Sequence, residues 1–182
     1  RLFRRVRERK DSDKLLDLVE RRLAVAEDTT EIAKLYWEQA RVLRKKGDYE
    51  ASLEALSNVT MLEPDHVGAL ALSGEVFIKQ GAFEEAAEAL SRLAALKEAP
   101  AQQRLISGVA AVDLYEKKLQ RIDRALDVLV ALHRAGLSTL PVRERLAGIA
   151  AKAGAWEDAT GMLEELMNER ETADGRVAAA RL

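Results

Sequence analysis

Few residues in this sequence could carry out chemistry. The two histidines, His66 and His133, are far apart, and there is no cysteine. A disulfide, a thiolate metal site, a cysteine nucleophile and a His-rich metal site are therefore excluded. His66 follows Pro64 at an expected helix start, where partial exposure accounts for it. His133 lies near an expected helix C-terminus, which favours its protonated form.

Motifs of catalysis and cofactor binding are missing as well. The patterns Gly-x-Ser-x-Gly, Gly-x-Gly-x-x-Gly, the phosphate loop and His-Glu-x-x-His do not occur. The triplet Asp11-Ser12-Asp13 resembles the start of a calcium loop, but the glycine and the distal glutamate of such a loop are missing, so we interpret it as a helix cap. We expect a protein that is not an enzyme and uses no cofactor and no metal.

The composition indicates an all-α chain about one domain long. Its 182 residues include 31 Ala and 27 Leu but only 10 Gly and 3 Pro, which is the usage of a helical protein. Charged residues interrupt every long apolar stretch, so no membrane insertion is expected. Residues 1–46 hold 14 Lys and Arg against 9 Asp and Glu, while residues 47–182 hold 15 against 22. So small a basic cluster does not indicate a nucleic-acid partner.

A repeated pattern organises these helices. The segment Gly47-Asp48-Tyr49-Glu50-Ala51 returns 34 residues later as Gly81-Ala82-Phe83-Glu84-Glu85, and again near the end as Gly154-Ala155-Trp156-Glu157-Asp158. A further copy, Ile122-Asp123-Arg124-Ala125, follows a spacing about five residues longer. Each unit is interpreted as two amphipathic helices joined by a tight turn. In the first unit Asp28 or Thr29 can cap the helix, and Gly47 stops it.

The pattern resembles the tetratricopeptide repeat family, whose unit of 34 residues is a helix–turn–helix with small residues where the helices touch. The matching positions are Tyr36, Ala40, Leu43, Tyr49, Ser52, Leu56 and Pro64 in the first unit, Leu70, Gly74, Phe77, Gly81, Phe83, Ala86 and Leu90 in the second, and Leu146, Ala147, Ala150, Gly154, Trp156, Ala159 and Leu163 in the fourth. The third unit departs, because Gln120 replaces the turn glycine and its first helix, about residues 101–117, is longer.

The resemblance implies a single domain, residues 1–182, that forms a right-handed α-solenoid of tandem hairpins. We expect repeats at residues 30–64, 67–98, 101–136 (divergent and longer) and 140–169, after a partial repeat at 1–29 and before a further helix that starts at 171–182. Neither end shows the polar face that finishes a solenoid, so we interpret the chain as a segment of a longer, bacterial repeat protein that self-associates weakly.

The resemblance also implies a concave groove, lined by one face of each first helix, that holds a peptide or a partner helix. Projected onto this chain, the groove positions are Lys34, Trp37, Arg41, Arg44 and Lys45, then Gly68, Ala71, Glu75, Ile78 and Lys79, and later Glu144, Gly148, Ala151 and Lys152. The family's carboxylate clamp for chaperone tails has Asn and Lys where this chain has Trp37 and Arg41, so that partner is not expected. Two structural alternatives stay open: Arg41 pairs with Glu75, or Trp37 packs on the preceding helix.

We therefore expect a protein–protein interaction scaffold that binds an acidic or C-terminal segment of a partner in this groove, because arginine suits carboxylates and Trp37 offers apolar area. Two alternatives remain: a regulatory or substrate-recognition arm of a larger enzyme, and a self-associating structural module. With no export signal visible we expect a cytoplasmic location, although the lack of cysteine fits the periplasm equally.

Overall fold

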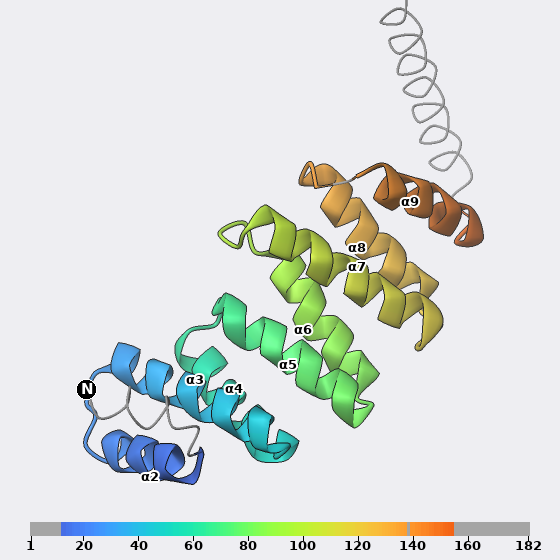
Figure 1. Cartoon of the computed structure of the whole chain (residues 1–182). Coiled ribbons are helices and arrows are strands. Elements are labelled where there is room, and N and C mark those ends of the chain that lie inside the picture. The colour runs from blue at the N-terminus through green and yellow to red at the C-terminus, as the bar shows by residue number, and fades with distance from the viewer. Residues whose placement is uncertain (1–11, 138, 155–182) are drawn as a thin grey trace, which may run out of the picture. The chain divides into compact units, whose positions relative to one another are not determined.

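The computed structural model describes residues 12–137 and 139–154, and all regular secondary structure in them is helical (Figure 1). The helices are α2 (Ser12–Leu23), α3 (Thr29–Lys46), α4 (Tyr49–Leu62), α5 (Val67–Gln80), α6 (Phe83–Ala95), α7 (Ala101–Lys117), α8 (Ile122–Arg134) and α9 (Leu140–Lys152). The predicted all-α class is confirmed. Within the described residues, no helix combines the length and the apolar character that a membrane crossing requires.

The chain divides into two compact units, residues 1–89 and 90–182, and the division falls within α6. Two pairs of consecutive helices pack as hairpins, α3 with α4 in the first unit and α7 with α8 in the second. A short turn at Gly81 joins α5 to α6. The partial repeat expected before residue 12 and the segment from residue 155 onward, which includes the second helix of the fourth repeat, lie outside the described residues.

The turns between paired helices depend on a left-handed residue. Gly47 ends α3 as predicted, with a φ of 81°, and Gly81 ends α5 with a φ of 77°. Gln120, in the turn after α7, is the one residue other than glycine with a positive φ among the described residues, at 54°. Glycine adopts this conformation without the steric penalty that a β-carbon brings, so Gln120 is strained where the other turns are not.

The first unit has a core at which α3, α4 and α5 meet. It consists of the buried residues Ala40, Leu43, Ala55, Leu56, Val59, Ala69, Leu72 and Val76. The buried hydroxyl of Ser52 donates a hydrogen bond to the carbonyl oxygen of Ala40 at 2.9 Å, which ties α4 to α3 at two of the predicted small-residue positions. At the other end of α3, the Asp28 carboxylate accepts the Glu31 backbone N–H at 2.8 Å, so Asp28 is the cap.

The third hairpin shows how the chain accommodates a longer repeat. The buried residues of α8, Ala125, Leu129 and Leu132, follow Ala86, Leu90 and Leu93 of α6 by 39 positions. The buried residues of α7 are offset by only 38, because Ser107, Gly108, Val112 and Leu114 correspond to Ala69, Leu70, Gly74 and Val76. Of the five residues by which this repeat exceeds 34, one therefore lies in the turn around Gln120, where the backbone N–H of Arg121 donates to the carbonyl of Tyr115 at 2.8 Å. The other four precede the buried positions of α7, which starts at Ala101, four positions ahead of the equivalent of Val67 in α5.

Candidate protein-interaction face

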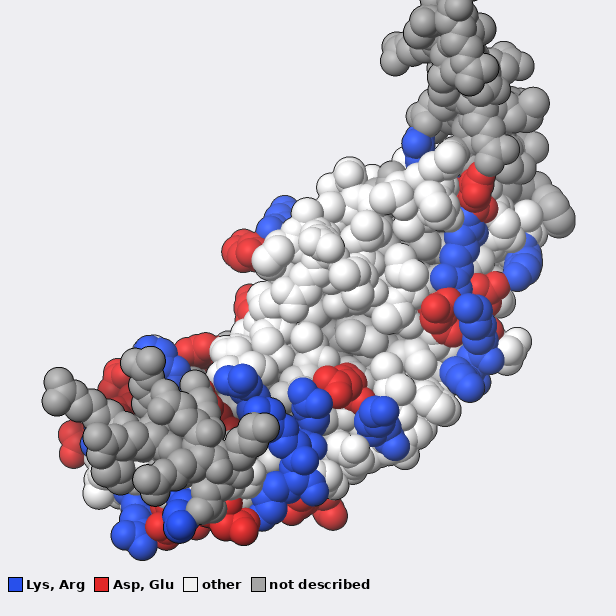
Figure 2. Space-filling view, viewed as in Figure 1, with Lys and Arg blue, Asp and Glu red and all other residues white. Residues whose placement is uncertain are grey.

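The predicted groove residues of the first unit lie on α3 and α5. We call Lys34, Trp37, Arg41, Arg44, Lys45, Glu75 and Lys79 the α3–α5 face. Figure 2 shows basic side chains gathered over α3 and the C-terminal end of α5, with acidic side chains next to them. Spacings of three, four and seven residues along one helix keep side chains on one stripe, which explains how α3 presents five of these residues together.

Trp37 packs against the start of α5. Its ring centroid lies 5.0 Å from that of His66, with the two planes inclined at 48°. A β-carbon on Gly68 would lie 3.0 Å from Cη2 and Cζ2 of Trp37, so the indole fills the space that a side chain at position 68 would need. These contacts join α3 to the next first helix, whereas the structural alternative placed Trp37 on the preceding one. The ring is half-buried and keeps an accessible part.

His66 has a structural role that the sequence did not reveal. Its Nδ1 accepts the backbone N–H of Ala69 at 3.0 Å, so the imidazole is the N-cap of α5. An acceptor nitrogen carries no proton, and the capped histidine is therefore the tautomer with its proton on Nε2. The cap holds the imidazole ring beside Trp37. The imidazole thus fixes the Trp37 ring of the α3–α5 face against the start of α5.

The two arginines of the face have different surroundings. The guanidinium carbon of Arg41 lies 5.7 Å from the centroid of the Trp37 ring, a cation–π distance, and Nη1 of Arg41 lies 3.6 Å from Oε1 of Glu38. Nη1 of Arg44 lies 3.2 Å from Oε1 of Glu75 on α5. The predicted alternative of an Arg41–Glu75 pair is thus corrected: Glu75 pairs with Arg44, because Arg41 lies over the indole.

The lysines of the face are exposed. Lys34 and Lys45 lie on α3 and Lys79 lies in the last turn of α5. Within the part of the chain that the structure describes, no ion pair involves any of the three. Beside them the side chain of Ile78, another projected groove residue, is 40% exposed. The face thus combines cations that can meet a second charge with apolar surface from Trp37 and Ile78.

The second unit carries a different arrangement on its first helices. With the offset of 38 residues, Asp113 and Glu116 of α7 occupy the repeat positions that Arg41 and Arg44 occupy on α3. Nη2 of Arg145 on α9 lies 2.6 Å from Oδ1 of Asp113 and 2.8 Å from Oε2 of Glu116. Lys152, a projected groove residue of α9, lies 2.7 Å from Oε1 of Glu116.

These contacts change the acidity of both carboxyls. The hydrogen bond from Lys152, with a second from Arg145, lowers the pKa of Glu116 below its ordinary value. Burial alone would raise the pKa of Asp113, but its ion pairs with Lys117 and Arg145 outweigh burial and lower it. Both groups therefore stay ionised at neutral pH, and their charges are paired with cations of the same chain.

This acidic cluster was not predicted from the sequence, because no groove positions were assigned to residues of α7. The signal that reveals it is the pattern of buried residues in α7, which requires the turn to hold one residue more than the others. No group of three or more His, Asp or Glu side chains that could hold a metal ion occurs among the described residues.

Comparisons with known proteins identify tetratricopeptide repeats in part of the chain. A sequence profile described as tetratricopeptide repeat matches residues 38–102, which run from α3 to the start of α7. Solved structures with a similar fold include a double mutant of MamA from Desulfovibrio magneticus RS-1 (17% identity, TM-score 0.57, covering 96% of this chain and 93% of that chain). Residues 38–102 thus match the tetratricopeptide repeat family, and the fold of the chain is similar to that of solved tetratricopeptide repeat structures. A search of curated proteins finds no sequence match.

Another similar structure is YrrB, described as a tetratricopeptide repeat protein with an unusual peptide-binding site. It shares 16% identity with this chain at a TM-score of 0.55, covering 99% of this chain and 89% of that one. At these identities the likeness concerns the fold, and it confirms the predicted class of helix–turn–helix hairpins as in tetratricopeptide solenoids.

Proposed function

We propose that this chain is a tetratricopeptide repeat protein that serves as a non-catalytic scaffold, and that its α3–α5 face binds an acidic segment of a partner protein. The proposal extends to the division into repeats at residues 30–64, 67–98, 101–136 and 140–169, of which the first two supply the face. The peptide-binding site described for YrrB, a protein of similar fold, supports binding of a peptide. The observation that carries the proposal is the placement of Arg41 over Trp37 beside Arg44 and three exposed lysines.

The chemistry of the face suits carboxylates next to an apolar side chain. A guanidinium has five N–H donors, and Arg44 contacts Glu75 through Nη1, so Nη2 can meet a second acceptor. The guanidinium of Arg41 lies over the indole, and a planar fork held in this way binds a carboxylate with less loss of side-chain entropy than a mobile lysine. Ile78 and the accessible part of Trp37 supply the apolar contact that such a peptide also needs.

The test is the binding of a defined peptide. A fluorescein-labelled peptide rich in Asp and Glu, with one leucine and a free C-terminus, is titrated with the wild-type chain and with the double variant Arg41→Glu, Arg44→Glu, and fluorescence anisotropy is recorded. We expect the reversal to abolish binding and to leave the melting temperature nearly unchanged, since exposed charges contribute little to folding. Binding should weaken as salt rises, because exposed charges are screened over about 8 Å at physiological ionic strength.

A matched control has the same charge change elsewhere. The double variant Lys97→Glu, Arg134→Glu alters two exposed cations outside the face, and it should bind the peptide like the wild type after allowance for net charge. If this control loses binding as completely as the reversal of Arg41 and Arg44, the attraction is general and the α3–α5 face is not the site. Trp37→Ala should cost affinity, and a loss of stability without a loss of affinity would assign Trp37 to packing alone.

A further inference from the structure

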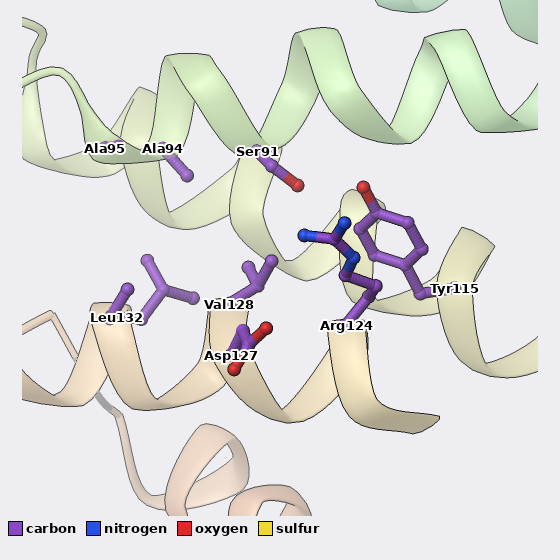
Figure 3. A pocket seen from close by; sticks show the side chains of 9 residues that line it. Ser91, Ala94, Ala95, Tyr115, Arg124, Asp127, Val128 and Leu132 are labelled. Carbon is purple, nitrogen blue, oxygen red and sulfur yellow. The ribbon is translucent and has the colours of Figure 1, made fainter. Parts of the chain in front are cut away.

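The second unit contains a cavity of about 210 Å³ between α6 and α8, with α7 behind it. Its apolar walls are Ala94 and Ala95 of α6 and Val128, Ala131 and Leu132 of α8. Figure 3 shows Ala94 and Ala95 on one side of the open space and Val128 and Leu132 on the facing side. The cavity is formed by the second helices of two successive hairpins, so it is separate from the first-helix positions that make the α3–α5 face.

Polar groups gather at one end of this cavity. The hydroxyl oxygen of Ser91 is buried and has no hydrogen-bond partner among the residues that the structure describes. The Arg124 side chain forms no ion pair with any residue that the structure describes. In Figure 3 the guanidinium of Arg124 points toward the Ser91 hydroxyl, and the ring of Tyr115 lies beside it. A buried hydroxyl group usually forms a hydrogen bond. The free hydroxyl of Ser91 beside a guanidinium without an ion pair therefore indicates an acceptor that comes from outside the chain.

We propose that this cavity binds a compact apolar carboxylic acid, with its carboxylate at Arg124 and Ser91 and its hydrocarbon group between Ala94, Val128 and Leu132. Arginine and a hydroxyl donor together match the two oxygens of a carboxylate. An apolar cavity of about 150 Å³ is large enough to hold benzene, so the space here accommodates a phenyl or branched aliphatic group. The acid is either a free small molecule or the apolar C-terminal residue of a polypeptide, since both present the same chemistry.

Two other features define the selectivity. Asp127 lines the cavity as well, and its negative charge opposes a bound carboxylate. The first unit has a second cavity, of about 330 Å³, between α2, α3 and α4, and its lining includes Glu20 and Glu54 but neither Lys nor Arg among the described residues. An acid should therefore bind in the cavity at Arg124 and not in the one at Glu20, which serves as an internal comparison.

The experiment titrates the full chain with 3-phenylpropanoate and records amide shifts by two-dimensional NMR, with 3-phenylpropanamide as the uncharged comparison. We expect saturable shifts in α6 and α8 with the acid only. Arg124→Gln should lower the affinity for the acid at least about tenfold, because hydrogen bonds to charged groups are stronger than those between neutral groups. Ala131→Phe, a change at an exposed lining residue, should fill the cavity and abolish binding. Arg134→Gln, the same substitution on the same helix outside the cavity, should leave the dissociation constant unchanged.

Several results would overturn the proposal. They are the absence of saturable shifts in the wild type, equal binding of acid and amide, and binding that survives Ala131→Phe. Asp127→Asn should raise the affinity for the acid several-fold. A lower affinity for the acid in that variant would contradict an anionic ligand. A tripeptide ending in a free leucine, compared with its C-terminal amide, then separates the two sources: a peptide acid that binds tighter than 3-phenylpropanoate indicates a chain terminus, and the reverse order indicates a small molecule.

Discussion

A β-carbon on Gly108 would lie 2.8 Å from Cδ1 and 3.1 Å from Cγ of Leu132. Leu132 is 1% exposed, so its whole side chain, and not only a mobile end, occupies that space. The helices α7 and α8 approach each other at this pair, and the closeness requires a residue without a side chain on α7. Gly108 thus has a packing role in the third hairpin.

Replacing Gly108 by alanine should destabilise the protein by about 1 kcal/mol, because overpacking typically costs 1–3 kcal/mol while alanine regains part of that through helix propensity. The matched control is Gly148→Ala in α9, where a β-carbon would meet nothing within 4 Å. That substitution should stabilise by about 0.5–1 kcal/mol. Chemical denaturation of both variants measures the two values. Equal effects of the same sign would contradict the close approach of α7 and α8.

Gln120→Gly should stabilise the protein. Gln120 has a φ of 54°, and a left-handed residue with a β-carbon costs about 1–2 kcal/mol, part of which glycine gives back through the greater freedom of the unfolded chain. We expect a net gain of about 0.5–1 kcal/mol in the free energy of unfolding, measured in urea. Gln120→Ala keeps the β-carbon and serves as the control. A gain as large in the alanine variant would mean that backbone strain is not the cause.

Most of the fold was predictable from the sequence, because the turn glycines and the 34-residue spacing mark the hairpins directly. Gly47 and Gly81 end helices where the pattern placed them, and Ser52 pairs with Ala40 at two positions assigned to close helix contact. The third repeat was predicted only in outline. One of its five extra residues lies in a turn without glycine and the other four precede the buried positions of α7, so the spacing of 39 residues could not by itself assign them to the helices or to the turn.

The candidate site was predictable as a set of positions, but not in its contacts. The stripe on α3 follows from helical geometry, whereas the partner of Glu75 depends on where the arginine side chains lie. Arg41 rests on Trp37, which leaves Arg44 to meet Glu75. The role of His66 was missed because histidine is not among the preferred N-cap residues. The pairing of Glu116 with Lys152 was missed because the residues of α7 could not be aligned with the groove positions of the other first helices.

The ion pairs between α7 and α9 should make the stability depend on pH. The folded-state pKa values of Asp113 and Glu116 are lowered, so their contribution is fully present above the ordinary carboxyl pKa and is lost as pH falls through the lowered values. The free energy of unfolding should therefore decline between about pH 5 and pH 3. Glu116→Gln removes one titrating group, and its decline over that range should be shallower. Parallel curves for wild type and variant would rule out this contribution.

Glu75→Gln should strengthen binding of the acidic peptide to the α3–α5 face. In the wild type the carboxylate of Glu75 already meets Arg44, so a peptide carboxylate has to compete with it. Removal of that negative charge leaves the guanidinium fully available, and we expect about a twofold to fivefold lower dissociation constant by anisotropy, in keeping with an exposed pair of about 0–1 kcal/mol. Glu50→Gln, an exposed change outside the face, is the control. An unchanged or weaker affinity in Glu75→Gln would show that the peptide does not reach Arg44.

The extra residue near Gln120 has a consequence for how such hairpins can be exchanged. One residue inserted within a helix rotates everything after it by about 100° around the helix axis, because a turn contains 3.6 residues. Inserted between the helices, the same residue leaves the buried faces of α7 and α8 in place. A chimera that exchanges whole hairpins should therefore be joined outside the helix pair and keep each turn with its own two helices. A single residue added in the turn changes the length of a repeat without altering which side chains form the core.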